Sequence, residues 1–217
     1  MDLQSVIALA WPVMLQGTGY TLLFAVASML FGLPLAGFIT LVRVLRVRVL
    51  QRLMALYVSA MRGTPLLVQV FIVYYGLPSI GIELSPITAG ILSLTLNVAA
   101  YMSETLRGSI NAVAQGQWLA GTSLGLTRRQ TLRYVIGPQA LRAAVPSLSN
   151  SLISLIKDTS LVSVIAVTEL MLATKELIST TFQPFPLYMA AAGVYWALSL
   201  GFEQVQRRME RRLAFPH

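Results

Sequence analysis

The sequence of 217 residues has no cysteine, and its single histidine is the last residue, His217. Disulfide bonds, thiolate metal sites and thiol chemistry are therefore excluded, and neither a catalytic histidine nor a histidine metal cluster can be assembled. Charged residues are also scarce, at 11%, whereas soluble domains carry about 25%. This scarcity of charge excludes an ordinary soluble domain with a solvated surface.

The sequence contains long apolar stretches without charged residues. Residues 20–42 are 23 consecutive residues without a charge, and residues 185–202 are 18 more. Helices of this length can cross a hydrocarbon core of roughly 30 Å, so the sequence predicts an all-α, polytopic membrane protein. Residues 1–16 carry an aspartate where a secretory signal would carry positive charge. We expect them to be retained as a short amphipathic or interfacial segment before the first span.

The net charge of +8 is concentrated in three groups of arginines. Each group flanks an apolar stretch, which indicates membrane topology and not a nucleic-acid partner. The positive-inside rule predicts that all three groups are cytoplasmic, with the N-terminus outside and the C-terminus inside. The groups are Arg43, Arg46, Arg48 and Arg52; Arg107, Arg128, Arg129, Arg133 and Arg142; and Arg207, Arg208, Arg211 and Arg212.

An even number of crossings must then separate consecutive groups, which predicts five transmembrane helices in one transmembrane domain, 1–217. The predicted spans are residues 20–42, 64–82, 87–106, 148–170 and 185–203. Pro34 should kink the first span. Two arrangements stay open around Arg62: one continuous helix that lifts it toward mid-membrane, or a bend at Gly63 and Pro65 that leaves it near the interface.

A basic segment, residues 108–147, separates the third and fourth predicted spans. A short helix is expected to end at Gly125, and Thr127 followed by Gln130 is a capping-box pattern that starts a helix over 128–136. Gly137 and Pro138 should end that helix, and another short helix should run to Pro146. The segment either rests on lipid head groups or docks a cytoplasmic partner.

Four stretches, in order, carry a resemblance that covers nearly the whole chain. They are "RGTPLLVQVFIVYYGLP", "AAYMSETLRGSINAV", "GQWLAGTSLGLTRRQTLRYVIGPQALRAAVPSLSN" and "LIKDTSLVSVIAVTEL". The chain resembles the permease subunits of binding-protein-dependent ABC importers of the polar-amino-acid uptake class. The third stretch is similar to their EAA loop, in which Glu-Ala-Ala precedes a glycine and an Ile-x-Leu-Pro ending.

The resemblance implies a type I importer fold in which this loop forms a coupling helix that docks on an ATPase subunit. Leu119 stands where the family has glutamate, so one polar contact of that docking is missing. Gly121 also departs from the pattern, whereas Gly125 and Pro138 fit it. The implied ATPase-docking residues are Trp118, Leu119, Ala120, Gly121, Gly125, Leu126, Arg128, Arg129 and Pro138.

Ionisable groups inside the predicted spans are functional candidates because they are costly to insert. Lys157 and Asp158 point about 100° apart on a helix, so they are poorly placed to pair with each other. They bind either a zwitterionic substrate or other helices, and Glu104 either pairs with Arg107 or faces the pathway. Gln69 and Asn97 are expected to be interhelical hydrogen-bond partners. The candidate substrate-pathway residues are Lys157, Asp158, Thr159, Ser160, Glu104, Arg62 and Gln69.

Together these features favour the membrane-spanning subunit of an ATP-driven amino-acid importer in a bacterial cytoplasmic membrane. The chain has no GxxxxGK[ST] phosphate loop, so it cannot be the ATPase. We expect a transport subunit without enzymatic activity or a bound cofactor, with ATP and magnesium on a partner. The expected partners are an ATPase dimer, a second permease (identical or related), a solute-binding protein, the amino acid and membrane lipid. The alternative is a secondary transporter or channel driven by an ion gradient; a membrane enzyme lacks the necessary groups.

Overall fold

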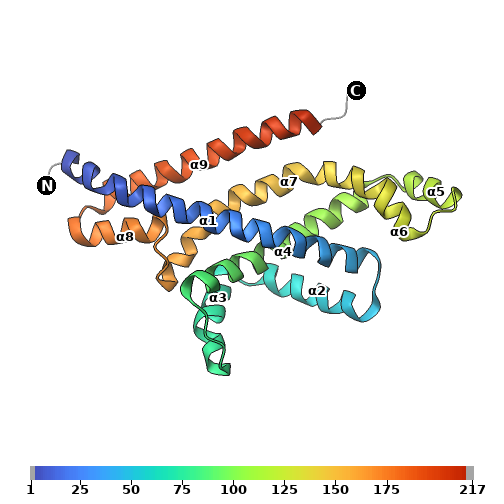
Figure 1. Cartoon of the computed structure of the whole chain (residues 1–217), viewed down its shortest axis with the longest axis horizontal. Coiled ribbons are helices and arrows are strands. Elements are labelled where there is room, and N and C mark those ends of the chain that lie inside the picture. Colours follow the sequence, from blue (N-terminus) through green and yellow to red (C-terminus); the bar gives the residue numbers. More distant parts are fainter. Residues whose placement is uncertain (1–2, 214–217) are drawn as a thin grey trace.

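A computed structural model describes residues 3–213, with side chains from residue 10 to residue 211. Within these residues the chain is built from helices without strands, which confirms the all-α prediction. The first helix, α1 (Leu3–Val44), runs from the N-terminal end of the bundle along α4 (Pro86–Ala112) and α7 (Gly137–Asp158) (Figure 1). The most extensive helix–helix contact in the fold is that between α1 and α4.

The N-terminal residues are part of α1, so the prediction of a separate interfacial segment is wrong. The helix continues through Pro12 and Pro34, and residues 10–44 are long and apolar enough to cross a membrane. The polar stretch near Gly17 does not break the helix because it is a close-packing site. A Cβ atom on Gly17 would lie 3.0 Å from the Leu170 Cα atom, at the start of α8 (Leu170–Thr181).

The chain bends sharply after α2 (Arg48–Gly63), as the second of the two arrangements around Arg62 predicted, although α2 runs unbroken through Arg62. The helix axis turns by 110° between residues 48–63 and 66–80. Thr64 has an extended backbone and Pro65 follows it, and α3 (Leu66–Phe71) begins immediately afterwards. The bend therefore leaves Arg62 at the C-terminal end of α2.

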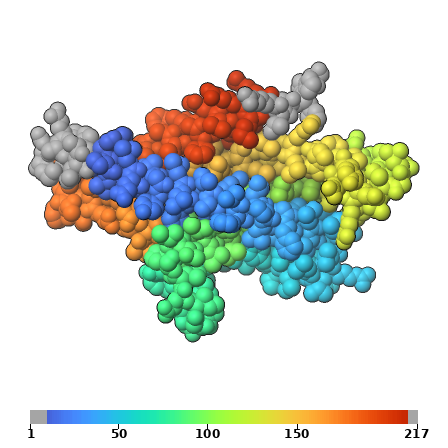
Figure 2. All heavy atoms as spheres, in the orientation of Figure 1, coloured from blue at the N-terminus to red at the C-terminus, as the bar shows by residue number. Residues whose placement is uncertain are grey.

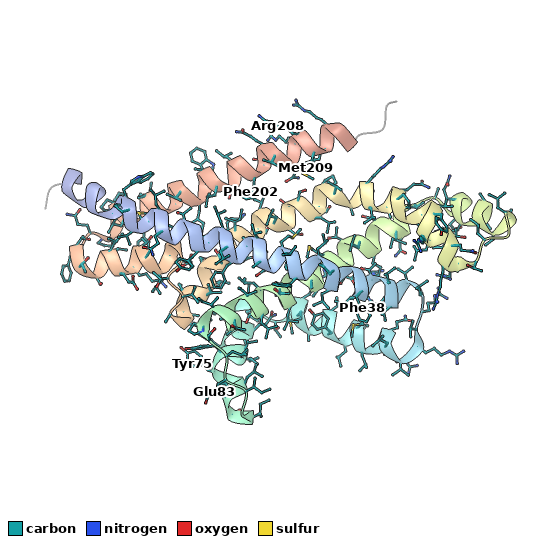
Figure 3. All side chains as sticks on the ribbon, viewed as in Figure 1. Phe38, Tyr75, Glu83, Phe202, Arg208 and Met209 are labelled. Carbon is teal, nitrogen blue, oxygen red and sulfur yellow. The ribbon has the colours of Figure 1, made fainter. Side chains whose placement is uncertain are left out.

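Beyond α3, which packs on α4 through the buried Val70, residues 72–85 project from the bundle as an arm. After α3 the chain widens into a π-helix, Ile72–Gly76, and closes with a 3-10 turn, Leu77–Ile80. The arm stands away from the other helices in the ribbon and space-filling views (Figures 1 and 2). It carries Tyr75 and Glu83 outward (Figure 3).

The basic segment folds as short helices at the end of the bundle opposite α8 (Figure 1). Helix α5 (Gln115–Ser123) ends before Gly125, whose φ of 76° lies in the left-handed region. The capping box between Thr127 and Gln130 is present at the start of α6 (Arg128–Thr131). The predictions of the turn and of the cap are confirmed.

The predicted helix end at Gly137 and Pro138 is wrong, as is the predicted helix end at Pro146. A π-helix, Leu132–Ile136, leads directly into α7, and the Gly137 amide donates to the Leu132 carbonyl. A Cβ atom on Gly137 would lie 2.6 Å from that carbonyl oxygen, so the glycine permits the wide turn. Pro138 sits in the first turn of α7, where its missing N–H is not needed. Packing of α7 against α4 carries the helix through Pro146.

After Asp158 the chain passes through a 3-10 segment, Thr159–Ile165, and then forms α8 and α9 (Pro184–Leu213). The predicted span 148–170 therefore covers the end of α7 and this 3-10 segment. In the described part of the chain, three helices are long and apolar enough to cross a membrane, and the bent pair at residue 64 can count as a fourth. The predicted number of five is not confirmed. The C-terminal half of α9 exposes Arg208 and Met209, whereas Phe202 is half-buried and packs against the core (Figure 3).

Candidate functional site

A polar cavity of about 790 Å³ lies between the end of α2, the middle of α4 and α7. Three of the predicted pathway residues line it: Arg62, Glu104 and Asp158. The bend at residue 64 brings Arg62 to the cavity, and the long α4 supplies Glu104 together with Asn97 and Tyr101. The guanidinium of Arg62 lies over the Tyr101 ring, 5.4 Å from its centroid.

The α7 side of the cavity is a polar stripe that the sequence reasoning missed. Its members recur at intervals of three or four residues, so one face of the helix points to the cavity. This periodicity inside an otherwise apolar stretch is a signal that could have been read from the sequence. The stripe consists of Ser147, Asn150, Ser151, Ser154 and Asp158.

Asp158 is the charged end of this stripe. It is half-buried, and among the described residues no hydrogen bond or ion pair joins it to another side chain. The neighbouring Lys157 is exposed and does not line the cavity. The expectation that the two do not pair with each other holds, and only the carboxylate faces the cavity.

Glu104 is held by three arginines from three helices. Its carboxylate pairs with Arg43 of α1, with Arg107 at 2.6 Å, and with Arg62 at 3.8 Å. The predicted contact with Arg107 is confirmed, and the contact with Arg43 could not be read from sequence separation. Only 16% of the Glu104 side chain is exposed. Its three arginine partners come from α1, α2 and α4, so the ion pairs hold these three helices together at one end of the cavity.

The remaining predicted pathway residues lie outside the cavity. Gln69 donates to the carbonyls of Met61 and Thr64, at 2.8 and 3.1 Å, and accepts from Asn97 at 2.9 Å. The predicted bond between Gln69 and Asn97 is thus confirmed, and it stabilises the bend. Thr159 is buried and donates to the Ile156 carbonyl at 2.7 Å, and Ser160 is half-buried without lining the cavity.

A buried carboxylate on the far side of the bundle was missed. Glu169 has no exposed surface and caps α8 by accepting from the Leu172 amide at 2.9 Å. It also accepts from the Tyr195 hydroxyl of α9 at 2.7 Å and from the Thr21 hydroxyl of α1 at 3.4 Å. An acidic residue directly before an apolar helix is the sequence feature that could have identified this cap. In the structure, Glu169 connects α1, α8 and α9 by hydrogen bonds.

The basic loop, residues 115–136, presents a cationic surface with exposed leucines. No acidic residue occurs between Glu104 and Asp158 in the sequence. Leu119 and Leu124 are 66% and 79% exposed. Gly121 is buried against Thr131, whose Cγ2 would lie 2.5 Å from a Cβ atom at that position. The glycine that departs from the family pattern is therefore required by the packing of α5 on α6.

The predicted docking residues do not all face outward. Ala120, Gly125, Arg129 and Pro138 are exposed, whereas Leu126 is half-buried. Trp118 packs against a small core around Ile136. The guanidinium of Arg128 lies 5.6 Å from the Trp118 ring centroid and donates to the Val44 carbonyl at 3.3 Å. Trp118 and Arg128 therefore contact each other, and Arg128 also contacts the C-terminal end of α1.

Known proteins of one family are similar to this chain along almost its whole length. The family model of the binding-protein-dependent transport system inner membrane component matches residues 28–215. The L-cystine transport system permease protein TcyB of Bacillus subtilis (strain 168) is 44% identical over 204 residues, covering 94% of this chain and 87% of that protein. The glutamine transport system permease protein GlnP of Escherichia coli (strain K12) is 35% identical, covering 94% of each chain.

Solved structures agree with this likeness. A chain in a crystal structure of an amino acid ABC transporter with histidines superposes with a TM-score of 0.92 at 33% identity, covering 98% of this chain and 99% of that one. A chain of the MetNI methionine ABC transporter in an inward-facing conformation gives a TM-score of 0.78 at 17% identity, covering 99% and 100%. The second similarity supports the fold alone.

Proposed function

Because the chain belongs to the family of binding-protein-dependent transport system inner membrane components, we propose that it carries a polar amino acid through the membrane while a separate ATPase subunit supplies the energy. The permease role in an ABC importer rests on the family and on relatives that span the same length. The polar amino acid, the ATPase and the direction of the chain in the membrane are our proposals.

The observation that carries the proposal is the cavity with Asp158 at its edge. A carboxylate without a partner in a half-buried position is costly in an apolar helix bundle. An ammonium group of the substrate would supply the missing partner, and the hydroxyls and amide of the α7 stripe would bind its other polar atoms. Arg62 of α2 also lines the cavity, and its side chain is 44% exposed. Its contact with Glu104, at 3.8 Å, is the longest of the three, so we propose that it also binds the substrate carboxylate.

Energy would reach this cavity from the basic loop through α7. The chain has no phosphate loop of its own, so we place ATP and magnesium on a partner that contacts Leu119, Leu124 and Arg129. The loop leads through a π-helix into α7 without a break. A displacement of the loop would therefore move the polar stripe that lines the cavity.

The proposed assembly contains further partners. A single bundle of this size gives one wall of a pathway, so we infer a second permease, identical or related, and a solute-binding protein on the outer side. The arginine groups support an orientation with the basic loop and the end of α9 inside and the α8–α9 turn outside. The bacterial cytoplasmic membrane is the proposed location.

The proposal is tested by uptake of radiolabelled amino acids into proteoliposomes that contain the permease and its ATPase. We expect uptake that requires ATP, and we expect Asp158→Asn to reduce it roughly 10- to 100-fold, because a hydrogen bond to a charged group contributes about 1.5–3 kcal/mol. Glu83→Gln, on the arm, is the matched control and should transport normally. Uptake that persists without nucleotide and collapses with the proton gradient would instead identify a secondary transporter.

A further inference from the structure

A second hollow, of about 800 Å³, lies at the C-terminal ends of α1 and α4, two helices that are long and apolar enough to cross a membrane. The turn between α1 and α2 closes one side, and α5 and α6 close the other. Its lining contains no carboxylate. Four guanidinium groups line it, those of Arg43, Arg46, Arg107 and Arg128.

Two of these four cations have no acidic partner. Arg43 and Arg107 are paired with Glu104. Arg128 contacts the Val44 carbonyl and the Trp118 ring, and in the described part of the chain Arg46 takes part in no ion pair. Arg43 and Arg107 share the single carboxylate of Glu104, so the four arginines around the hollow keep an excess of three positive charges over that carboxylate.

The backbone at Arg46 has the left-handed conformation of a cap at the C-terminal end of α1. Its φ of 57° lies in the left-handed region, which side chains with a Cβ atom rarely adopt and which glycine adopts without cost. Hydrogen bonds from the Leu45 amide to Leu41 and from the Val47 amide to Val42, at 2.9 and 3.2 Å, hold this turn. The bond from Val47 to Val42 is that of a Schellman cap, in which the residue after the helix end is left-handed. The cap therefore explains the backbone of Arg46, and glycine is the usual residue at this position.

A simpler explanation for the arginines is that they neutralise the carbonyl groups at helix ends. This explains only some of the residues that line the hollow. The contact from Arg128 to the Val44 carbonyl is of this kind, because carbonyls at a helix C-terminus attract cations. It does not account for the side chain of Arg46 in the hollow, because the cap needs only a left-handed backbone at this position. Nor does it explain why the hollow is also lined by the amide side chains of Gln51, Asn111 and Gln115.

We propose that this hollow binds a phosphate group at the membrane boundary, through Arg46 and Arg128. The planar fork of arginine matches the oxygens of phosphate, and basic pockets between membrane helices on the cytoplasmic side bind anionic head groups. Trp118 is a residue type that favours this depth, and the apolar Ile110 and Val113 line the same hollow. The phosphate comes either from an anionic lipid or from free phosphate. In both cases Trp118 and Arg128 belong to this site, and the outward docking face is formed by Leu124 and Arg129 together with Leu119, which also lines the hollow.

Isothermal titration of the full-length permease tests the site, alone and with its ATPase bound. The probes are dihexanoyl phosphatidylglycerol, dihexanoyl phosphatidylcholine and inorganic phosphate. We expect Arg46→Gln/Arg128→Gln to weaken binding about 30-fold, since each basic side chain near an anionic surface contributes about fivefold. The control Arg208→Gln/Arg211→Gln, on α9, should change affinity less than twofold.

Arg46→Gly separates binding from folding. It removes the charge and relieves the left-handed strain, so the variant should be at least as stable as the parent while binding the probe about fivefold more weakly. Preference for phosphatidylglycerol over phosphatidylcholine and phosphate identifies a lipid site, and equal binding of inorganic phosphate identifies a free-anion site; both support the proposal.

Three outcomes overturn it. One is the absence of binding by phosphatidylglycerol and by phosphate. The second is an equal loss of affinity in the α9 control pair, which would mean surface charge without a site. The third is displacement of the probe by the ATPase together with weaker ATPase binding in Arg46→Gly, which would assign the arginines to acidic side chains of that partner.

Discussion

The polar cavity and the basic loop differ in whether their charged side chains are paired. At the cavity, the Glu104 carboxylate is surrounded by arginines of three helices and is mostly buried. In the loop, cations are exposed and no acidic residue occurs between Glu104 and Asp158. Both regions lie on the same chain and are joined by α7.

Solvation explains the difference. A charge inside a membrane span costs about 2.5–3.5 kcal/mol on insertion scales, so it is retained together with a partner. An exposed arginine is solvated and needs no partner. Asp158 is therefore the exception in the cavity that suggests a substrate contact, whereas the acid-free surface of the loop suggests a partner protein with opposite charge.

The largest effect on stability is expected from Glu104→Gln, which removes the carboxylate that pairs with the arginines. The variant leaves Arg43 and Arg107 without their carboxylate. We expect a loss of about 3 kcal/mol in the free energy of unfolding, the lower end of the range for breaking a buried ion pair, measured by thermal unfolding in detergent. The exposed pair of Arg207 and Glu203 is the control. Glu203→Gln should cost less than about 0.5 kcal/mol, and equal losses in both variants would remove the distinction between the two regions.

A smaller effect is expected in the loop from Gly121→Ala, although this change restores the family pattern. The added Cβ atom would lie 2.5 Å from the Thr131 Cγ2 atom, and overpacking of this kind costs about 1–3 kcal/mol. The ATPase activity of the complex and the unfolding midpoint should both decrease. Gly116→Ala, on the same helix with open space around it, should leave both unchanged or slightly improved. Improvement in Gly121→Ala would contradict the packing of α5 on α6.

Tyr195→Phe tests the buried carboxylate of Glu169, which pairs with hydroxyl groups and not with arginines. The variant removes one of the donors to Glu169 and should cost about 0.5–1.5 kcal/mol, the contribution of a single hydrogen bond. Tyr188→Phe on the same helix, where Tyr188 is 44% exposed, is the control in the same thermal assay. A larger loss in the control would show that the ring environment matters more than the hydroxyl.

The smallest effect is expected from a single exposed cation of the loop, in Arg129→Gln. ATPase binding should weaken by up to about 1 kcal/mol, and the difference from the parent should shrink as salt is raised, because charges at the rim of an interface are screened. Titration of the ATPase at low and high salt measures this. A loss that does not depend on salt would show that Arg129 contributes through packing.

Local sequence signals predicted the elements that depend on nearby residues. The capping box at Thr127 and the turn at Gly125 follow from side chains within a few positions of one another. The pair of Glu104 and Arg107 is likewise one helical turn apart. The bond between Gln69 and Asn97 was predicted because polar groups within apolar spans need partners.

Predictions that depended on tertiary packing were wrong. The prolines at 138 and 146 are helix-ending signals in isolation, yet α7 begins at the first and passes through the second because it packs along α4. The N-terminal residues continue as α1 because Gly17 lies against α8. The cavity could have been found in part from the polar stripe of α7, whereas the approach of Arg43 to Glu104 requires knowing that α1 and α4 are neighbours.

The most direct test uses the absence of native cysteine, which makes a single introduced thiol specific. Leu124→Cys, in the loop, and Phe182→Cys, in the α8–α9 turn, are placed at side chains that are 79% and 85% exposed. A membrane-impermeant maleimide should label Phe182→Cys from outside intact cells. It should label Leu124→Cys only in inverted vesicles, where added ATPase should block the reaction. Labelling of Leu124→Cys from outside, or unprotected labelling in the presence of the ATPase, would contradict the account.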